Sequence, residues 1–215
     1  MIEISIVQKI AIWALPVLFA ITGHEVAHGW VASLFGDQTA RLSGRLTLNP
    51  LKHIDPLGTV VVPLVMLMFS NFIFGWAKPV PVDARNLRNP RTDMILVALA
   101  GPTANFIMAL IWAAIAKLSM SVAPWFGVPL MGMGMAGIEI NIVLGVLNCL
   151  PIPPLDGGRA LYNILPGKMA WYFYHLEPYG FFILLILMFT GVLNYLLFPP
   201  IIYLTKTVIE LFGLM

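Results

Sequence analysis

Two histidines and a glutamate in the first apolar segment have the residue types and spacing of a catalytic metal site. The run Gly23-His24-Glu25-Val26-Ala27-His28-Gly29 places its histidines four residues apart, so on a helix both side chains project from one face, one turn apart. Two imidazole nitrogens placed in this way can bind one tetrahedral zinc ion. Glu25 lies beside the metal without having to bind it, and it can accept a proton from the metal's water.

This pattern is improbable as an accident of composition. Only four of the 215 residues are histidine and five are glutamate, so His-Glu-x-x-His arises by chance in roughly 0.2% of such chains. Charged and polar side chains inside an apolar helix are also expensive in a membrane, where they generally serve a function. The alternative is a pair of core histidines that are hydrogen-bonded to their neighbours.

The composition indicates an integral membrane protein. Hydrophobic residues make up 60% of the chain and charged residues 10%, whereas soluble domains carry about 25% charged residues. We expect the first apolar helix to be retained, because neither a basic leader nor a small-residue cleavage site accompanies it. The net charge of +2 gives no reason to expect nucleic-acid binding. The single cysteine, Cys149, excludes an internal disulfide and a multi-cysteine zinc site.

The alternation of apolar and polar segments predicts one all-α membrane domain over residues 1–215. It is a polytopic helical bundle of about 5–6 transmembrane or re-entrant segments with short extended loops. An interfacial stretch is expected at 160–177, and Pro199-Pro200 is expected to separate the last two helices. The expected helices are 4–35, 94–120, 138–150, 179–198 and 201–214.

The basic residues predict which loops face the cytoplasm. Nine of the twelve Lys and Arg lie in 37–56, 77–93 and 159–168, whereas 121–134 has none. The positive-inside rule puts the three basic segments in the cytoplasm and the uncharged one outside. The apolar run 57–76 would then enter and leave the membrane from the cytoplasmic side, and a plain crossing is the alternative.

Catalytic zinc usually has three protein ligands, and four side chains are candidates for the third. Asp156 is preferred because three prolines precede it and two glycines follow, and a membrane tolerates such irregular backbone only where protein or a wet cavity surrounds it. A carboxylate there needs a partner such as a metal. Glu139 is expected at a solvated helix start. His53 and His175 are expected in supporting or interfacial positions.

Two motifs in order resemble those of the site-2 protease family of intramembrane zinc metalloproteases. They are the His-Glu-x-x-His run at 24–28 and the run Asn148-Cys149-Leu150-Pro151-Ile152-Pro153-Pro154-Leu155-Asp156-Gly157; the stretches 49–56 and 100–105 also look like family segments. The resemblance covers most of residues 20–165. It implies one Zn²⁺ per chain bound by His24, His28 and Asp156, with Glu25 as general base and Asn148 as a substrate- or oxyanion-binding residue.

The motifs predict an intramembrane zinc metalloendopeptidase of a prokaryotic inner membrane. It would hydrolyse peptide bonds within or near transmembrane helices of membrane proteins, with zinc-bound water as nucleophile and Glu25 as general base. The extended stretches 43–48 and 79–82 could pair with an unwound substrate strand. The alternative is a zinc transporter or metal-binding membrane protein without protease activity, which gives Glu25 no role. The oligomeric state is left open by the sequence.

Overall fold

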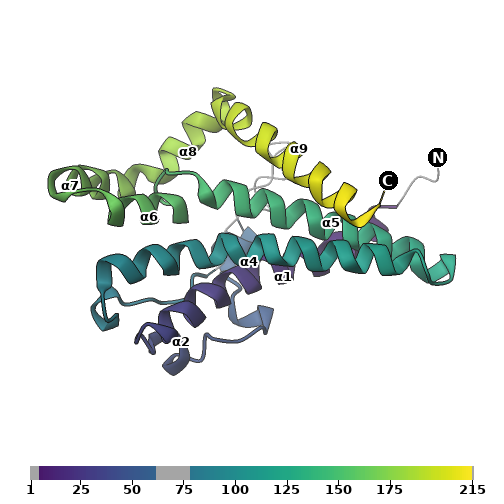
Figure 1. Cartoon of the computed structure of the whole chain (residues 1–215), viewed down its shortest axis with the longest axis horizontal. Helices are drawn as coiled ribbons and strands as arrows, with labels where there is room; N and C mark the ends of the chain where they lie inside the picture. Colours follow the sequence, from purple (N-terminus) through teal and green to yellow (C-terminus); the bar gives the residue numbers. More distant parts are fainter. Residues whose placement is uncertain (1–4, 62–77, 215) are drawn as a thin grey trace.

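The structure, a computed structural model, describes residues 5–61 and 78–214 (Figure 1). The described ranges contain helices and irregular segments and no β-strand. Five of their helical segments are long and apolar enough to cross a membrane. The predicted polytopic helical bundle is therefore confirmed. The five segments are Val7–Leu34, Pro90–Ser119, Pro124–Cys149, Gly167–Phe189 and Val192–Phe212.

Three long helices form the centre of the molecule: α1 (Ile6–Leu34), α4 (Pro90–Ser119) and α5 (Pro124–Cys149) (Figure 1). Both α4 and α5 begin with proline, which suits the first helical position because its missing N–H would have no partner there. α4 packs against both of the other helices. It is the common neighbour of every element that carries a site residue.

Small residues bring α4 and α5 into close contact. A Cβ at Gly137 of α5 would overlap the indole ring of Trp112 on α4, and one at Gly134 would overlap Ala116. Helices in lipid associate largely through such close packing, because burial from water is not available as a driving force. The two helices therefore form a tight pair around a core that includes Ala109, Trp112, Ile138 and Ile142.

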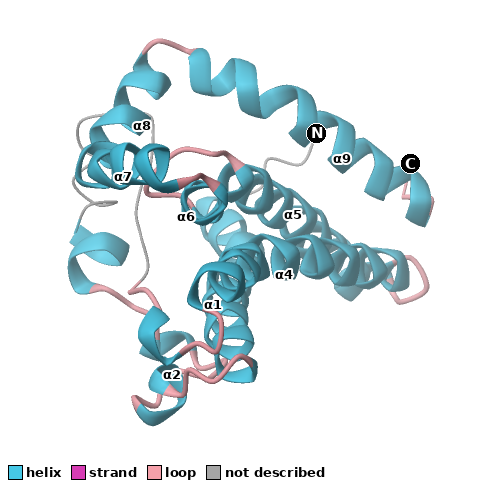
Figure 2. Cartoon of the chain, turned by 60° about the vertical axis from the view of Figure 1, so that its left-hand side comes forward, coloured by secondary structure: helices cyan, strands magenta, loops and turns pink. Residues whose placement is uncertain are grey.

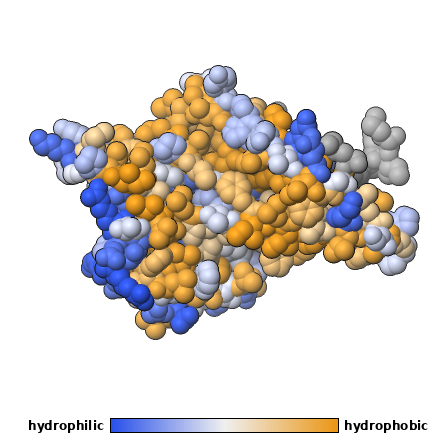
Figure 3. Space-filling model, in the orientation of Figure 1, coloured by the Kyte–Doolittle hydropathy of each residue, from blue (hydrophilic) through white to orange (hydrophobic). Residues whose placement is uncertain are grey.

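The short elements gather at the end of the bundle where α1 ends and α4 begins. They are α2 (Thr39–Leu42), η1 (Pro50–Lys52), η2 (Pro56–Val61), η3 (Ala84–Asn86) and α6 (Asp156–Ile164). Figure 3 shows hydrophilic residues concentrated at this end and apolar residues over the long helices. The peptide N–H of Lys78 donates to the carbonyl of His53 at 2.9 Å. The two basic segments before and after the apolar run are therefore in contact, while residues 62–76 of that run lie outside the described residues, and the side of the membrane that they face stays a prediction.

Buried Asp37 ties these loops together. Its carboxylate accepts the N–H of Thr39 at 3.0 Å, the N–H of Asp83 at 2.7 Å and the side-chain amide of Asn86 at 3.1 Å. Burial of Asp37 raises its pKa, whereas the hydrogen bonds from the Thr39 hydroxyl and the other donors lower it. Together the hydrogen bonds have the larger effect, so the pKa lies below its ordinary value. The charged carboxylate thus fixes the segment before α4 against the end of α1.

The structure corrects the predicted start of the third spanning helix. α5 begins at Pro124, so most of the uncharged stretch 121–134, predicted as an external segment, is helical. Its absence of charge reflects a membrane-embedded helix, not a loop.

The structure also corrects the break between the last two helices. α7 (Gly167–Leu176) and η4 (Glu177–Tyr179) lead into α8 (Gly180–Phe189), which ends at Thr190-Gly191, and α9 (Val192–Phe212) contains Pro199 and Pro200 in its interior. Gly191 has φ +76°, a left-handed conformation that glycine adopts at little cost. Proline fixes φ at a helical value, and membrane helices tolerate its missing N–H. Figure 2 shows the arm that α8 and α9 form beside α5.

Candidate metal centre

The structure brings His24, His28 and Asp156 together. The Nε2 atoms of the two histidines lie 3.1 Å apart, and they are 3.0 and 3.3 Å from Oδ2 of Asp156. Ligand atoms around one tetrahedral zinc, with bonds near 2.05 Å, are about 3.3 Å apart. The three side chains are therefore spaced as the ligands of a single zinc ion would be. They come from two adjacent turns of α1 and from the first residue of α6.

The hydrogen bonds behind the rings fix which nitrogen carries the proton. Nδ1 of His28 lies 2.7 Å from the carbonyl of Val97, which can only accept, so this nitrogen is protonated. Nδ1 of His24 lies 2.6 Å from Oδ1 of Asn105. The Asn105 amide is oriented by donating its Nδ2 to the Ala20 carbonyl at 3.2 Å and to Oδ1 of Asn141 at 3.0 Å. In their neutral form, the form that binds a metal, both histidines therefore present a bare Nε2 lone pair to Asp156.

This arrangement fits a cation. Oδ2 of Asp156 is buried and finds no hydrogen-bond donor within the described ranges, and the two Nε2 lone pairs face the same point. Buried polar atoms without partners are costly, so such a cluster is favourable when a metal is shared among them. A Cβ at Gly101 of α4 would overlap both imidazoles. The glycine therefore leaves the room that the two rings need.

The sequence after α5 explains how a carboxylate reaches this point. α5 ends at Cys149, and the chain continues irregularly through three prolines before α6 begins. A Cβ at Gly157 would lie within 2.6 Å of the Cys149 and Leu150 carbonyl groups, and one at Gly158 would be 2.7 Å from Ile152. Only glycine lets α6 start pressed against the end of α5. Asp156, the residue before this pair, is buried as a result.

Glu25, the residue after His24, has a different kind of partner. Its Oε2 accepts the peptide N–H of Val80 at 2.7 Å. Val80 belongs to residues 78–83, a segment without helix or strand that we name the strap. The guanidinium of Arg45 donates to the carbonyl of Lys78 at 2.7 Å and fastens the strap from outside. The expectation that 79–82 is not helical is confirmed, and its extended backbone stays a prediction.

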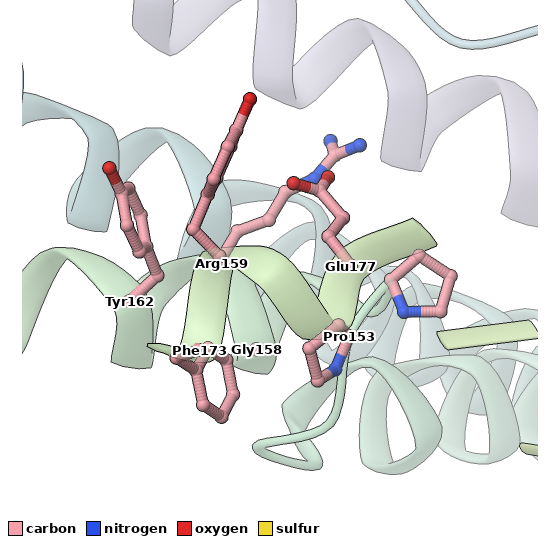
Figure 4. Close-up of a pocket in the computed structure, with 8 residues that line it drawn as sticks. Pro153, Gly158, Arg159, Tyr162, Phe173 and Glu177 are labelled. Carbon is pink, nitrogen blue, oxygen red and sulfur yellow. The ribbon is translucent and has the colours of Figure 1, made fainter. Parts of the chain in front are cut away.

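A cavity of about 290 Å³ lies between the strap and two residues of the cluster, His28 and Asp156. Its walls are formed by α1, the strap, α4 and α6, and its lining residues include Glu25, His28, Val80, Val97 and Asp156. Arg159 and Glu177 line it as well, and Figure 4 shows their side chains extending to the same side of a smaller neighbouring crevice. The larger cavity offers a peptide both an apolar wall and the polar groups of the site.

The other predicted residues lie apart from the three ligands. The amide of Asn148 donates to the carbonyl of Leu144 at 3.0 Å and does not line the cavity, so its role stays a prediction. His53 is buried, with Nε2 2.9 Å from the carbonyl of Thr47, and its own carbonyl holds the strap. His175 is exposed, and its Nδ1 lies 2.8 Å from the carbonyl of Trp171.

Glu139 corrects one expectation. It lies inside α5, fifteen residues after Pro124, instead of at a solvated helix start. The expectation failed because the start of α5 was placed too late in the chain. Glu139 lines a separate cavity with residues of α9 and is not part of the metal cluster.

Two buried amides support the cluster; sequence reasoning left the role of Asn105 open and missed Asn141. Asn105 and Asn141 are fully buried, and Asn141 donates its Nδ2 to the carbonyl of Gly137 at 2.9 Å. Amides are poor markers of a metal site because they need not bind the ion. The available signal was an asparagine within each of two apolar spanning helices.

Comparison with known proteins finds relatives in bacteria. A Bacillus subtilis (strain 168) protein that carries the provisional name zinc metalloprotease YwhC is 37% identical over 203 residues, which is 93% of this chain and 90% of the relative. The provisionally named zinc metalloprotease Rip2 of Mycolicibacterium smegmatis is 30% identical over 181 residues, 82% of this chain and 66% of the relative. Rip2 of Mycobacterium tuberculosis (H37Rv) is 31% identical over 158 residues, 72% of this chain and 56% of the relative. No family model and no solved structure matches the chain.

Proposed function

The chain belongs to the site-2 protease family of zinc metalloproteases, and on this premise we propose that it hydrolyses peptide bonds within or near transmembrane helices of membrane proteins. The observation that carries the proposal is the convergence of two bare Nε2 atoms and one buried carboxylate beside Glu25 in a cavity. A site for metal storage or structure has no use for an adjacent carboxylate that stays outside the ligand set. A hydrolase does.

We propose His24, His28 and Asp156 as the ligands of one Zn²⁺ per chain. The donor set of two imidazoles and one carboxylate is one that catalytic zinc uses, and it leaves a position open for water or substrate. When bound, the ion would polarise the scissile carbonyl group and make water a stronger acid. The histidines offer their neutral Nε2 atoms as metal ligands, because the hydrogen bonds to Val97 and Asn105 keep the ring protons on Nδ1.

Glu25 supplies the proton transfers. Its carboxylate lines the cavity and can accept a proton from the water that attacks the peptide carbon, then deliver this proton to the leaving nitrogen. The hydrogen bond from the Val80 N–H uses one of its two oxygens and orients the group, so the other oxygen stays available to water.

The strap is the proposed place for an unwound stretch of substrate. Of the two extended stretches that the sequence suggests, only 79–82 lines the cavity. Pro79 and Pro81 have no N–H, and the Val80 N–H is bound to Glu25. A substrate strand would therefore pair mainly with strap carbonyls and with the N–H of Val82.

The protein acts, in this proposal, as a single domain of residues 1–215 in a prokaryotic inner membrane. Five spanning segments support the integral membrane location, and the curated relatives are bacterial. The basic end of the bundle would face the cytoplasm.

The decisive experiment is Glu25→Gln in purified protein, with zinc content and cleavage of a transmembrane substrate measured together. We expect zinc to remain at one per chain and cleavage to fall by about 10²–10⁴-fold, the usual contribution of a general base. Glu139→Gln, which removes a carboxylate from another face of the bundle, is the matched control and should leave both unchanged.

Two outcomes would refute the assignment. Cleavage at the wild-type rate by the Glu25→Gln variant excludes Glu25 as the base, and loss of zinc from this variant makes Glu25 a ligand. Zinc flux across proteoliposomes without cleavage would instead favour the transporter alternative, which leaves Glu25 and the strap without a role.

A further inference from the structure

Arg91, in the first turn of α4, contacts the far end of the helix that carries Asp156. Its Nε donates to the carbonyl of Asn163 at 2.8 Å, and its Nη2 donates to the carbonyls of Ile164 at 3.3 Å and Leu165 at 2.6 Å. These are the carbonyls of the last two residues of α6 (Asp156–Ile164) and of Leu165, the residue that follows the helix. One guanidinium therefore caps the C-terminal end of α6 from a different helix.

α6 depends on such external support. It has nine residues, so it is about 13 Å long, and it contains two consecutive glycines, which favour the unfolded chain. The final carbonyls of a helix have no partners within it, and a cation at this end is also attracted by the helix dipole. Arg91 supplies both the donors and the charge.

α4 holds the other two ligands as well. Its Val97 carbonyl fixes the ring of His28, and its Asn105 amide fixes the ring of His24. The three contacts at 91, 97 and 105 lie on one helix within about 21 Å of its length. α4 thus orients all three ligands although none of them belongs to it.

We propose that Arg91 is a positioning residue for Asp156: by clamping the C-terminal end of α6 to α4, it fixes the carboxylate at the other end against the two imidazoles. The inference rests on the metal site of the proposed function. It adds a requirement for a residue that touches neither the ligand atoms nor the cavity. Sequence reasoning gave Arg91 no role other than as one of the positive charges that set the topology.

The test compares Arg91→Ala and Arg91→Lys with Arg88→Ala in the full-length protein. Arg88 is a neighbouring basic residue whose recorded hydrogen bond uses only its backbone N–H, to Phe35, and this bond survives the change to alanine. The zinc dissociation constant is measured by chelator competition. We expect it to rise by about 10–100-fold in Arg91→Ala, as for other residues that orient metal ligands, to recover partly in Arg91→Lys, and to change less than twofold in Arg88→Ala.

Hydrogen–deuterium exchange on zinc-free protein separates positioning from a general loss of stability. Arg91→Ala should speed exchange in residues 156–165 and leave α5 unchanged. Combining Arg91→Ala with Asp156→Asn supplies the second separation, because an effect transmitted through Asp156 is not additive with its removal. Fully additive losses, unchanged exchange in α6, or a wild-type zinc affinity in Arg91→Ala would each overturn the inference. If the wild-type protein binds no zinc in the first place, the proposed function fails instead.

Discussion

The side chains of the His-Glu-x-x-His turn are held by two different kinds of structure. On the ligand side, His24 and His28 are held by buried groups of α4, and the bond from Asn105 continues to Asn141 of α5. On the strap side, half-buried Glu25 accepts a hydrogen bond from the backbone of the strap. The strap is fastened in turn by loop residues, including Arg45 and Asp37. Helices fix the proposed metal ligands, and a loop holds the proposed base.

This difference matches what each side must do. Metal ligands need to stay within a few tenths of an ångström of one geometry, which packed helices can guarantee. A substrate must enter beside the base, and loops change conformation at lower cost than packed helices. Changes on the ligand side should therefore remove the metal, whereas changes on the strap side should reduce turnover and leave the metal in place.

The largest effect is expected from Gly101→Ala on the ligand side. The new Cβ would overlap both imidazoles, and neither ring can retreat without breaking its bond to Val97 or Asn105. Zinc binding should weaken by more than about 100-fold, beyond the range for orienting residues, and cleavage should disappear. Zinc content and chelator competition check this.

Gly145→Ala is the matched control for that change. It likewise adds a methyl group at a contact between helices, here from α5 against the ring of Phe106 on α4, away from the proposed ligands. It should lower the melting temperature and keep zinc. One zinc per chain at wild-type affinity in Gly101→Ala would show that the rings are not confined as the geometry implies.

Asn105→Ala should have the next largest effect. It removes the acceptor that keeps the proton of His24 on Nδ1, and loss of such a partner usually costs about 10–100-fold in metal affinity. It also leaves Oδ1 of Asn141 without its donor, at a cost of about 1–3 kcal/mol in stability. Titration with zinc and thermal unfolding of the zinc-free protein measure the two effects separately.

Asn141→Ala separates these two consequences. It disturbs the same chain of amides one step farther from the metal, so it should lower stability with a smaller change in zinc affinity. Equal losses of affinity in both variants would mean that the amides act through packing, not through the tautomer of His24.

The sequence was informative where chemistry restricts the choice of residue. Few side chains bind zinc, so the spacing of His24 and His28 and the broken backbone before Asp156 sufficed to predict the cluster. The long apolar helices were equally predictable, because a bilayer imposes their length.

The supporting contacts were not predictable, for physical reasons. A carbonyl such as that of Val97 is present in every residue, so the sequence carries no mark of it. The bond from Asn105 to His24 joins residues 81 positions apart, and the helix packing decides which amide reaches the ring. The prediction of the helix ends failed for a similar reason. The two prolines at 199 and 200 favour a break, whereas Gly191, where the left-handed turn occurs, cannot be told in the sequence from any other glycine in an apolar run.

The smallest effect is expected from Val80→Pro on the strap side. This change removes the N–H that binds Glu25, and the backbone can accommodate it, because Val80 already lies between two prolines in a segment without helix or strand. Hydrogen bonds to charged groups contribute about 1.5–3 kcal/mol; if roughly half of this orients the base in the transition state, kcat falls by about tenfold. KM and zinc content should stay within twofold of the wild type.

Val80→Ala keeps the N–H and trims the side chain that packs near Gly29, so it should retain most of the activity. Equal losses of kcat in the two variants would assign the effect to side-chain packing. Loss of zinc in Val80→Pro would show that the two sides of the turn are one mechanical unit, and the distinction between a fixed metal centre and an adaptable base would then be wrong.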